Sequence, residues 1–309
     1  MKIKKTRNSL LGITALLGSV FAISTVGYQI ADTNRTAIDN ALGTKSYEVL
    51  KDEASARFKS KYSSLDEVRK AAKDIAIEQG QEGTVIMKND NGVLPLTTKK
   101  VALFGGASYM PYCGNSDLKA GNNDAVDLVK ALEDHGVTID PTLKAIYDEI
   151  IADQTEIKGQ WGGTTIKYNK LYNSAAGDMV PYQINEVNPS DFGKEGYGSK
   201  PDWESAIDKN NTIGIVTFAR GVGEGSAYLP GVSLNSKGEM VQRDPLALSD
   251  DELALVDAAK RTCSKVVVLL NTGNNMEIGE IAKGGAHEVD GIAYIGIPND
   301  YQFTGIVDV

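Results

Sequence analysis

The sequence predicts an α/β protein in which a mainly parallel six-stranded sheet is flanked by helices and follows one apolar N-terminal helix. Two observations predict the sheet: short apolar runs alternate with helix-like segments, and most of these runs stop at glycine or proline. An uncharged stretch after a basic start predicts the leading helix. We expect residues 1–31 to be a membrane anchor or signal segment, 32–79 a spacer and leading helix, and 80–309 an α/β sandwich domain.

The N-terminus has the pattern of a membrane segment. Four basic residues lie in the first seven positions, and residues 8–31 carry no charge. About twenty uncharged residues can span a bilayer, and the basic cluster would stay in the cytoplasm. The pattern predicts that residues 9–28 cross the membrane as an uncleaved anchor, which places the rest of the chain outside the cytoplasm. A cleaved signal peptide, which would give a secreted protein, and an ordinary buried helix are the alternatives.

Further along the chain, strand and helix patterns alternate. Ser64 is a candidate N-cap with Glu67 three residues later, and that helix should end between Gly80 and Gly83. Ser249 and Glu252 repeat the capping pattern. The expected strands are residues 84–87, 101–104, 137–139, 213–218, 265–270 and 291–297. The other expected helices are residues 124–135, 141–151, 274–282 and a last one near the end of the chain.

The stretch from 158 to 203 interrupts this alternation. It is rich in glycine and asparagine and holds six tyrosines and tryptophans: Trp161, Tyr168, Tyr172, Tyr182, Tyr197 and Trp203. Tyrosine and tryptophan suit stacking on sugar rings because they combine an apolar face with a polar edge. The alternative is a long surface excursion whose aromatic side chains pack on the domain.

Composition and motifs exclude several classes of function. The formal net charge of −9, despite the basic start, argues against a nucleic-acid partner. The turn at 105–107 lacks the G-x-G-x-x-G spacing of dinucleotide sites, and the chain has no Walker lysine or G-x-S-x-G motif. His135 and His287 stand without ligand spacing, so we predict no metal and no cofactor. Cys113 and Cys263 permit one disulfide, although Cys263 reads as a small buried apolar residue.

One acidic residue stands out beside a predicted strand. The apolar run from Ile213 to Phe218 leads into a glycine-rich loop in which glycines flank Glu224. Ligands of open α/β sheets bind outside the carboxyl ends of the strands. Glycoside hydrolysis needs two carboxyl groups, and Glu224 supplies one candidate acid while no convincing motif supplies the second. The alternative is a solvated glutamate on a surface loop.

Several stretches taken together resemble glycoside hydrolase family 3, over roughly residues 80–309. They are Glu82–Asn89, Gly92–Leu96, Lys100–Gly105, Gly223–Ser226, Asp244–Ser249, Val266–Gly273 and Gly291–Val309. The resemblance implies that Glu224 is the general acid/base and that Gly223, Gly225 and Ser226 contact substrate. Where this family often continues with Asp-Arg, the chain has Ala227-Tyr228.

The resemblance also implies a partner domain. The family's aspartate nucleophile and most of its sugar pocket lie on a barrel that this sequence lacks, and the order of segments is similar to permuted, membrane-attached members. We therefore expect the acid/base domain of a β-glycosidase, resembling β-glucosidases, that acts on an oligosaccharide or β-glycoside. Its barrel would be supplied downstream or in trans. The alternative is a non-catalytic, surface-tethered carbohydrate-binding or scaffolding module, which needs no barrel.

Overall fold

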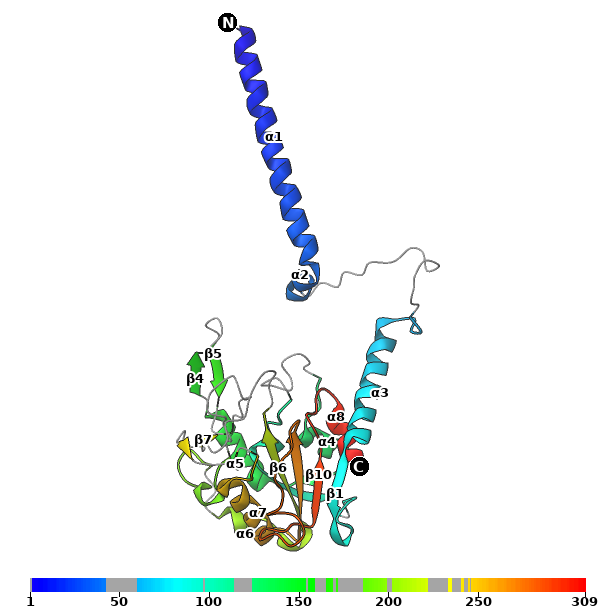
Figure 1. Ribbon diagram of the computed structural model, residues 1–309, viewed down its shortest axis with the longest axis vertical. Coiled ribbons are helices and arrows are strands. Elements are labelled where there is room, and N and C mark those ends of the chain that lie inside the picture. Colours follow the sequence, from blue (N-terminus) through cyan, green and yellow to red (C-terminus); the bar gives the residue numbers. More distant parts are fainter. Residues whose placement is uncertain are drawn as a thin grey trace. The chain divides into compact units, whose positions relative to one another are not determined.

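The computed structural model forms two compact units, Met1–Ser63 and Ser64–Val309 (Figure 1). The residues that it describes are 2–42, 60–96, 98–113, 124–153, 155–158, 165–168, 171, 186–198, 202–221, 233–234, 240–241, 244 and 246–309.

The described part of the first unit contains helix α1 (Lys2–Thr33) and the short helix α2 (Arg35–Leu42). The stretch Leu10–Thr33 is long and apolar enough to cross a membrane, and none of it is buried within the chain. Three hydroxyl groups in it donate to the carbonyl oxygen four residues earlier, at 2.9–3.0 Å, which satisfies them inside the helix. They belong to Thr14, Ser19 and Thr25. The predicted apolar helix is confirmed as a helix.

The second unit is built on a six-stranded sheet with the order β1-β10-β9-β6-β2-β3. Neighbouring strands from β10 to β3 are all parallel, whereas β1 pairs antiparallel with β10. The strands are β1 (Val85–Asn89), β2 (Lys100–Phe104), β3 (Thr138–Ile139), β6 (Ile213–Arg220), β9 (Lys265–Thr272) and β10 (Gly291–Tyr294). The predicted mainly parallel sheet is confirmed, and the carboxyl ends of its parallel strands share one edge.

Helices cover both faces of this sheet (Figure 1). Successive strand side chains point to opposite faces, so Ala102 and Phe104 join the core beneath α5, α6 and α7, while Val101 and Leu103 join the core beneath α4 and α8. The helices are α4 (Leu128–Asp134), α5 (Pro141–Ala152), α6 (Trp203–Ala206), α7 (Asp250–Thr262) and α8 (Gln302–Asp308). The result is the three-layer sandwich that the alternating pattern predicts.

Helix α3 (Leu65–Gly83) packs along α8 (Figure 1). Its N-cap is Ser64, whose hydroxyl accepts a hydrogen bond from the amide of Glu67 as predicted. Glycines let the two backbones touch, because a Cβ atom on Gly305 would lie 1.9 Å from the carbonyl oxygen of Ile77, and one on Gly80 would lie 2.1 Å from that of Gln302. This contact fixes the C-terminal part of α3 on the sandwich.

Two short antiparallel hairpins accompany the main sheet. Strands β4 (Thr155–Lys158) and β5 (Thr165–Tyr168) form one, and β7 (Ser233–Leu234) and β8 (Met240–Val241) form the other. The second hairpin lies in the stretch after β6 for which the sequence indicates only an irregular loop.

The predicted helix at 274–282 was wrong, because these residues form bends, a turn and one β-bridge. The amide of Glu277 bonds to the carbonyl oxygen of Leu246 at 2.9 Å, and Ala247 and Glu277 form an isolated bridge. This pairing with a distant segment outcompetes the weak helical pattern of a short stretch.

Two other elements are shorter than predicted. Helix α4 begins at Leu128 instead of 124, because the carboxylate of Asp127 caps it by accepting from the amide of Lys130 at 2.8 Å. Strand β10 ends at Tyr294 instead of 297. Gly296 adopts a positive φ of 65°, which breaks the extended backbone.

The aromatic residues described in the stretch from 158 to 203 pack on the domain. Trp203 is buried and meets the rings of Phe104 and Phe192 edge to face, and Tyr197 packs against the same core. This confirms the packing alternative for both residues. Trp161, Tyr172 and Tyr182 lie outside the described residues, as does the side chain of Tyr168.

The two cysteines are buried on opposite faces of the sheet. Cys263 belongs to the core beneath α5–α7 and Cys113 to the core beneath α4 and α8, so they are not bonded to each other. Burial raises the pKa of the Cys263 thiol to about 11, which keeps it protonated and inert. The reading of Cys263 as a small core residue is confirmed.

Candidate active site at the carboxyl edge of the sheet

The predicted acid stands on a loop that leaves the centre of the sheet. Glu224 itself, with Gly223, Gly225 and Ser226, lies outside the described residues. The structure describes the frame of that loop: β6 ends at Arg220, residues 222–232 lie outside the described part, and the segment that enters α7 is described at Asp244 and from Leu246 onward. Because β6 lies between β9 and β2, the loop starts at the middle of the edge where open α/β sheets bind ligands.

A buried ion pair ties the two ends of this loop together. Arg220 is fully buried, and its guanidinium makes a bidentate pair with Glu252 on α7 at 2.6 and 2.8 Å. The same guanidinium donates to the carbonyl oxygens of Ala219 at 2.9 Å and Ala247 at 2.8 Å. One side chain therefore connects the last residue of β6 to the segment that enters α7.

Glu252 has a second task at the start of α7. Its Oε2 atom accepts from the amide of Ser249 at 2.6 Å, while the hydroxyl of Ser249 accepts from the amide of Glu252 at 2.9 Å. This is the predicted capping box, with both bonds present. Sequence reasoning found the cap but missed Arg220, whose only signal is a lone arginine closing an apolar strand.

The glycine turn after β2 is occupied by groups of the protein itself. The amide of Gly106 donates to the Oε2 atom of Glu186, and the amide of Gly105 donates to the hydroxyl of Tyr147, both at 2.8 Å. Only glycine fits at position 105. Its φ is +86°, and a Cβ atom there would lie 2.5 Å from the carbonyl oxygen of Thr217. A carboxylate thus occupies the place that a phosphate would take in a nucleotide site.

Glu186 is a carboxyl group with an unusual proton affinity. Burial raises its pKa to about 8, and the hydrogen bonds from the amides of Val187 and Gly106 oppose that rise only in part. The side chain is 5% exposed, and each oxygen accepts a backbone amide. Through these two bonds Glu186 holds the Gly106 turn in place. The sequence analysis did not identify Glu186, because it lies 80 residues after Gly106, the residue whose amide it binds.

A buried amide holds the neighbouring loops in place. The side chain of Asn271, near the end of β9, accepts from the amide of Tyr112 at 2.6 Å and donates to the carbonyl oxygen of Tyr112 at 3.0 Å. It also donates to the carbonyl oxygen of Gly296 at 2.9 Å. The segments that follow β2 and β10 are therefore fixed to the central part of the same edge.

The chain from Ser64 onward thus folds as an α/β sandwich whose described carboxyl edge is polar and internally bonded. A family model described as the glycosyl hydrolase family 3 C-terminal domain matches residues 84–309, and the chain therefore belongs to this family. No curated protein matches the chain.

Solved structures of β-glucosidases share the fold. The β-glucosidase 3B from Thermotoga neapolitana in complex with glucose aligns with a TM-score of 0.51 at 24% identity, over 78% of this chain and 29% of that one. A β-glucosidase from Paenibacillus barengoltzii aligns with a TM-score of 0.51 at 18% identity, over 76% and 22%. The chain thus spans less than a third of the length of these proteins.

Loss of the partner of Arg220 should destabilise the domain strongly. Breaking a buried ion pair from one side costs about 3–5 kcal/mol, because it leaves an uncompensated buried charge. We expect that loss of unfolding free energy for Glu252→Ala in urea titrations. The matched control is Glu204→Ala, which breaks an exposed pair with Arg261 and should cost less than about 1 kcal/mol. Equal losses in the two variants would contradict the structural role of Arg220.

The raised pKa of Glu186 should make the unfolding free energy of the domain depend on pH. Between its ordinary value of 4.5 and about 8, the folded state holds a proton that the unfolded state releases, so the unfolding free energy falls as the pH rises through this window. Glu186→Gln removes the titration and should flatten that decline, as measured by urea unfolding at pH 5, 6, 7 and 8. The exposed Glu195→Gln should leave the slope as it is, and an unchanged slope in Glu186→Gln would refute the assignment.

Proposed function

We propose that residues 80–309 are the acid/base domain of a β-glycosidase and that Glu224 is its general acid/base. The observation that carries the proposal is the frame on either side of Glu224 in the sequence: central strand β6 ends at Arg220, whose guanidinium bonds to Glu252 and to the carbonyl oxygen of Ala247. Membership of glycosyl hydrolase family 3 supports the reaction class.

The chemistry assigns Glu224 two successive tasks. As an acid it protonates the leaving oxygen of the glycoside, and as a base it then takes a proton from the water that hydrolyses the glycosyl-enzyme intermediate. A retaining mechanism needs a second carboxylate about 5 Å away as nucleophile. Among the described residues, the buried carboxyl groups at this edge, Glu186 and Glu252, are already bonded to the backbone and to Arg220. We therefore propose that a barrel domain, encoded downstream or supplied in trans, brings the nucleophile.

The substrate is proposed to be an oligosaccharide or β-glycoside, since the solved proteins of this fold are β-glucosidases, one of them in complex with glucose. The second candidate is a non-catalytic carbohydrate-binding or scaffolding module. Ala227-Tyr228, in place of the more usual Asp-Arg, favours that candidate. A barrel reading frame directly after this one would decide for the enzyme.

Removal of the acid proton should slow hydrolysis in a way that depends on the leaving group. General acid catalysis is worth about 10²–10⁴-fold, so Glu224→Gln should lose that much activity on alkyl glycosides and less on aryl glycosides with good leaving groups. The rates are measured with the barrel fused or added in trans. The parent chain without the barrel should show little or no hydrolysis.

The control for this experiment is Glu204→Gln, which alters an exposed glutamate on α6 and should keep the parent rate. Equal rates of Glu224→Gln and the parent on the alkyl glycoside would remove Glu224 from the mechanism. Robust hydrolysis by the 309-residue chain alone would remove the need for a barrel.

We also propose that residues 9–28 anchor the protein in a membrane with the sandwich outside the cytoplasm. The basic cluster before the span and the exposure of its apolar side chains support this. Protease added to intact cells should digest the sandwich while the chain sediments with membranes. A soluble, protected cytoplasmic protein would contradict the anchor, and a shortened chain in the medium would show signal cleavage instead.

A further inference from the structure

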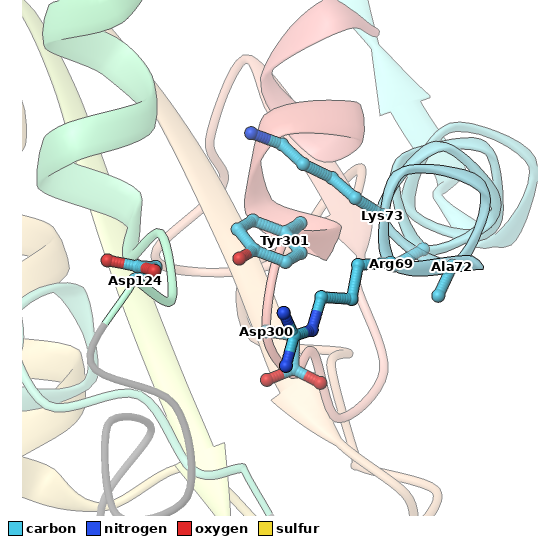
Figure 2. Close-up of a pocket in the computed structure, with 7 residues that line it drawn as sticks. Arg69, Ala72, Lys73, Asp124, Asp300 and Tyr301 are labelled. Carbon is cyan, nitrogen blue, oxygen red and sulfur yellow. The ribbon is translucent and has the colours of Figure 1, made fainter. Parts of the chain in front are cut away.

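A cleft opens where α3 and α8 face the segment before α4 (Figure 2). Its volume is about 630 Å³, within the usual range for small-molecule sites. Two of its lining residues, Asp300 and Tyr301, come from the turn that follows β10, and Asp124 comes from the segment that follows β2. The cleft therefore belongs to the carboxyl side of the sheet, where α/β proteins bind ligands.

The walls of the cleft are fixed to each other. The amide of Val126 donates to the carbonyl oxygen of Asp300 at 2.7 Å, which joins the segment before α4 to the turn before α8. Asp300 adopts a left-handed φ of 45°, an uncommon conformation for a residue other than glycine. The third wall, α3, is held on α8 by the glycine contacts at Gly80 and Gly305. The side chains are thus presented by a rigid frame.

The charged groups of the cleft are of both signs. Arg69 and Lys73 reach in from α3, and Asp124 and Asp300 stand on the other elements (Figure 2). Arg69 also pairs with Asp66, one turn earlier on α3, at 3.4 Å. Because cations and carboxylates stand close together, an acidic or a basic small molecule meets repulsion as well as attraction there. Hydroxyl groups suit such a site, because they accept hydrogen bonds from the cations and donate to the carboxylates.

The remaining lining is apolar. Figure 2 shows the ring of Tyr301 in the middle of the cleft, and Lys73 Nζ lies 4.7 Å from the centroid of that ring. Ala72 and Ala76, one turn apart on α3, leave room beside it. A tyrosine ring and small methyl groups match the C–H faces of a sugar, while the surrounding charged groups match its hydroxyls.

We infer that this cleft is an accessory subsite for a neutral oligosaccharide, separate from the Glu224 loop. The inference rests on the proposed glycoside class of substrate, and not on the catalytic role of Glu224. The site would hold a distal sugar unit of the chain that is hydrolysed at the Glu224 loop, or keep the enzyme close to a polysaccharide.

Saturation-transfer NMR with cellotetraose tests the subsite. The full chain is placed in phosphatidylcholine nanodiscs, so that no sugar-based detergent competes. We expect binding with a Kd of about 1 mM, typical of a weak single-site contact, and at least about tenfold weaker binding after Tyr301→Ala. Arg69→Gln should weaken binding as well, because it removes hydroxyl-binding donors from the cleft.

The matched control is Tyr62→Ala. Tyr62 also lies under a lysine, with Lys61 Nζ 5.0 Å from its ring centroid, but it does not line the cleft. This variant should bind cellotetraose like the parent. No binding up to about 20 mM, an equal affinity after Tyr301→Ala, or a preference for the zwitterion glycylglycine or for inorganic phosphate would overturn the subsite.

The two proposals fail separately. If Glu224→Gln abolishes hydrolysis while Tyr301→Ala leaves cellotetraose binding intact, the subsite is wrong and the acid assignment stands. If Tyr301→Ala abolishes binding while Glu224→Gln leaves hydrolysis unchanged, the acid assignment is wrong and the subsite stands.

Discussion

A guanidinium buried at the end of the central strand constrains the carboxyl edge of this sheet. Arg220 cannot stay charged in the core without a partner, and the partner, Glu252, stands at the start of α7. The guanidinium of Arg220 bonds both to Glu252 and to the carbonyl oxygen of Ala247. These bonds bring the end of β6, the backbone at Ala247 and the first turn of α7 together. Glu224 stands in sequence between the two segments that this interaction joins. We therefore expect the position of the candidate acid to depend on the Arg220–Glu252 pair.

Two other buried polar side chains at this edge also form their hydrogen bonds within the protein. Glu186 occupies the amides of the glycine turn, and Asn271 joins the segments that follow β2 and β10. Buried polar groups whose hydrogen bonds are made within the protein keep the edge rigid, and they offer few hydrogen-bonding groups to a ligand. We propose that ligands bind instead at the Glu224 loop and in the cleft beside Tyr301.

Much of the fold was predictable because its signals are local. Apolar runs such as Val266–Leu270 are long, β-branched and closed by turn residues, and the Ser249 cap lies three residues from its partner Glu252. The contacts that shape the site could not be predicted, because Gly106 and Glu186 are joined only by the folded chain. The helix predicted at 274–282 failed for a related reason, since pairing with Ala247 outweighs local propensity. Glu224 was found from its loop and the family resemblance, and its role stays a prediction.

The central claim is that Glu224 delivers and removes the proton in a retaining reaction whose nucleophile lies on another domain. Rescue of Glu224→Ala by azide, with the barrel supplied and an aryl β-glycoside as substrate, tests this most directly. An anionic nucleophile needs no base to attack the glycosyl-enzyme intermediate, so the account predicts that azide restores turnover and yields a β-glycosyl azide. A variant whose rate does not respond to azide, with the free sugar as the only product, would contradict it.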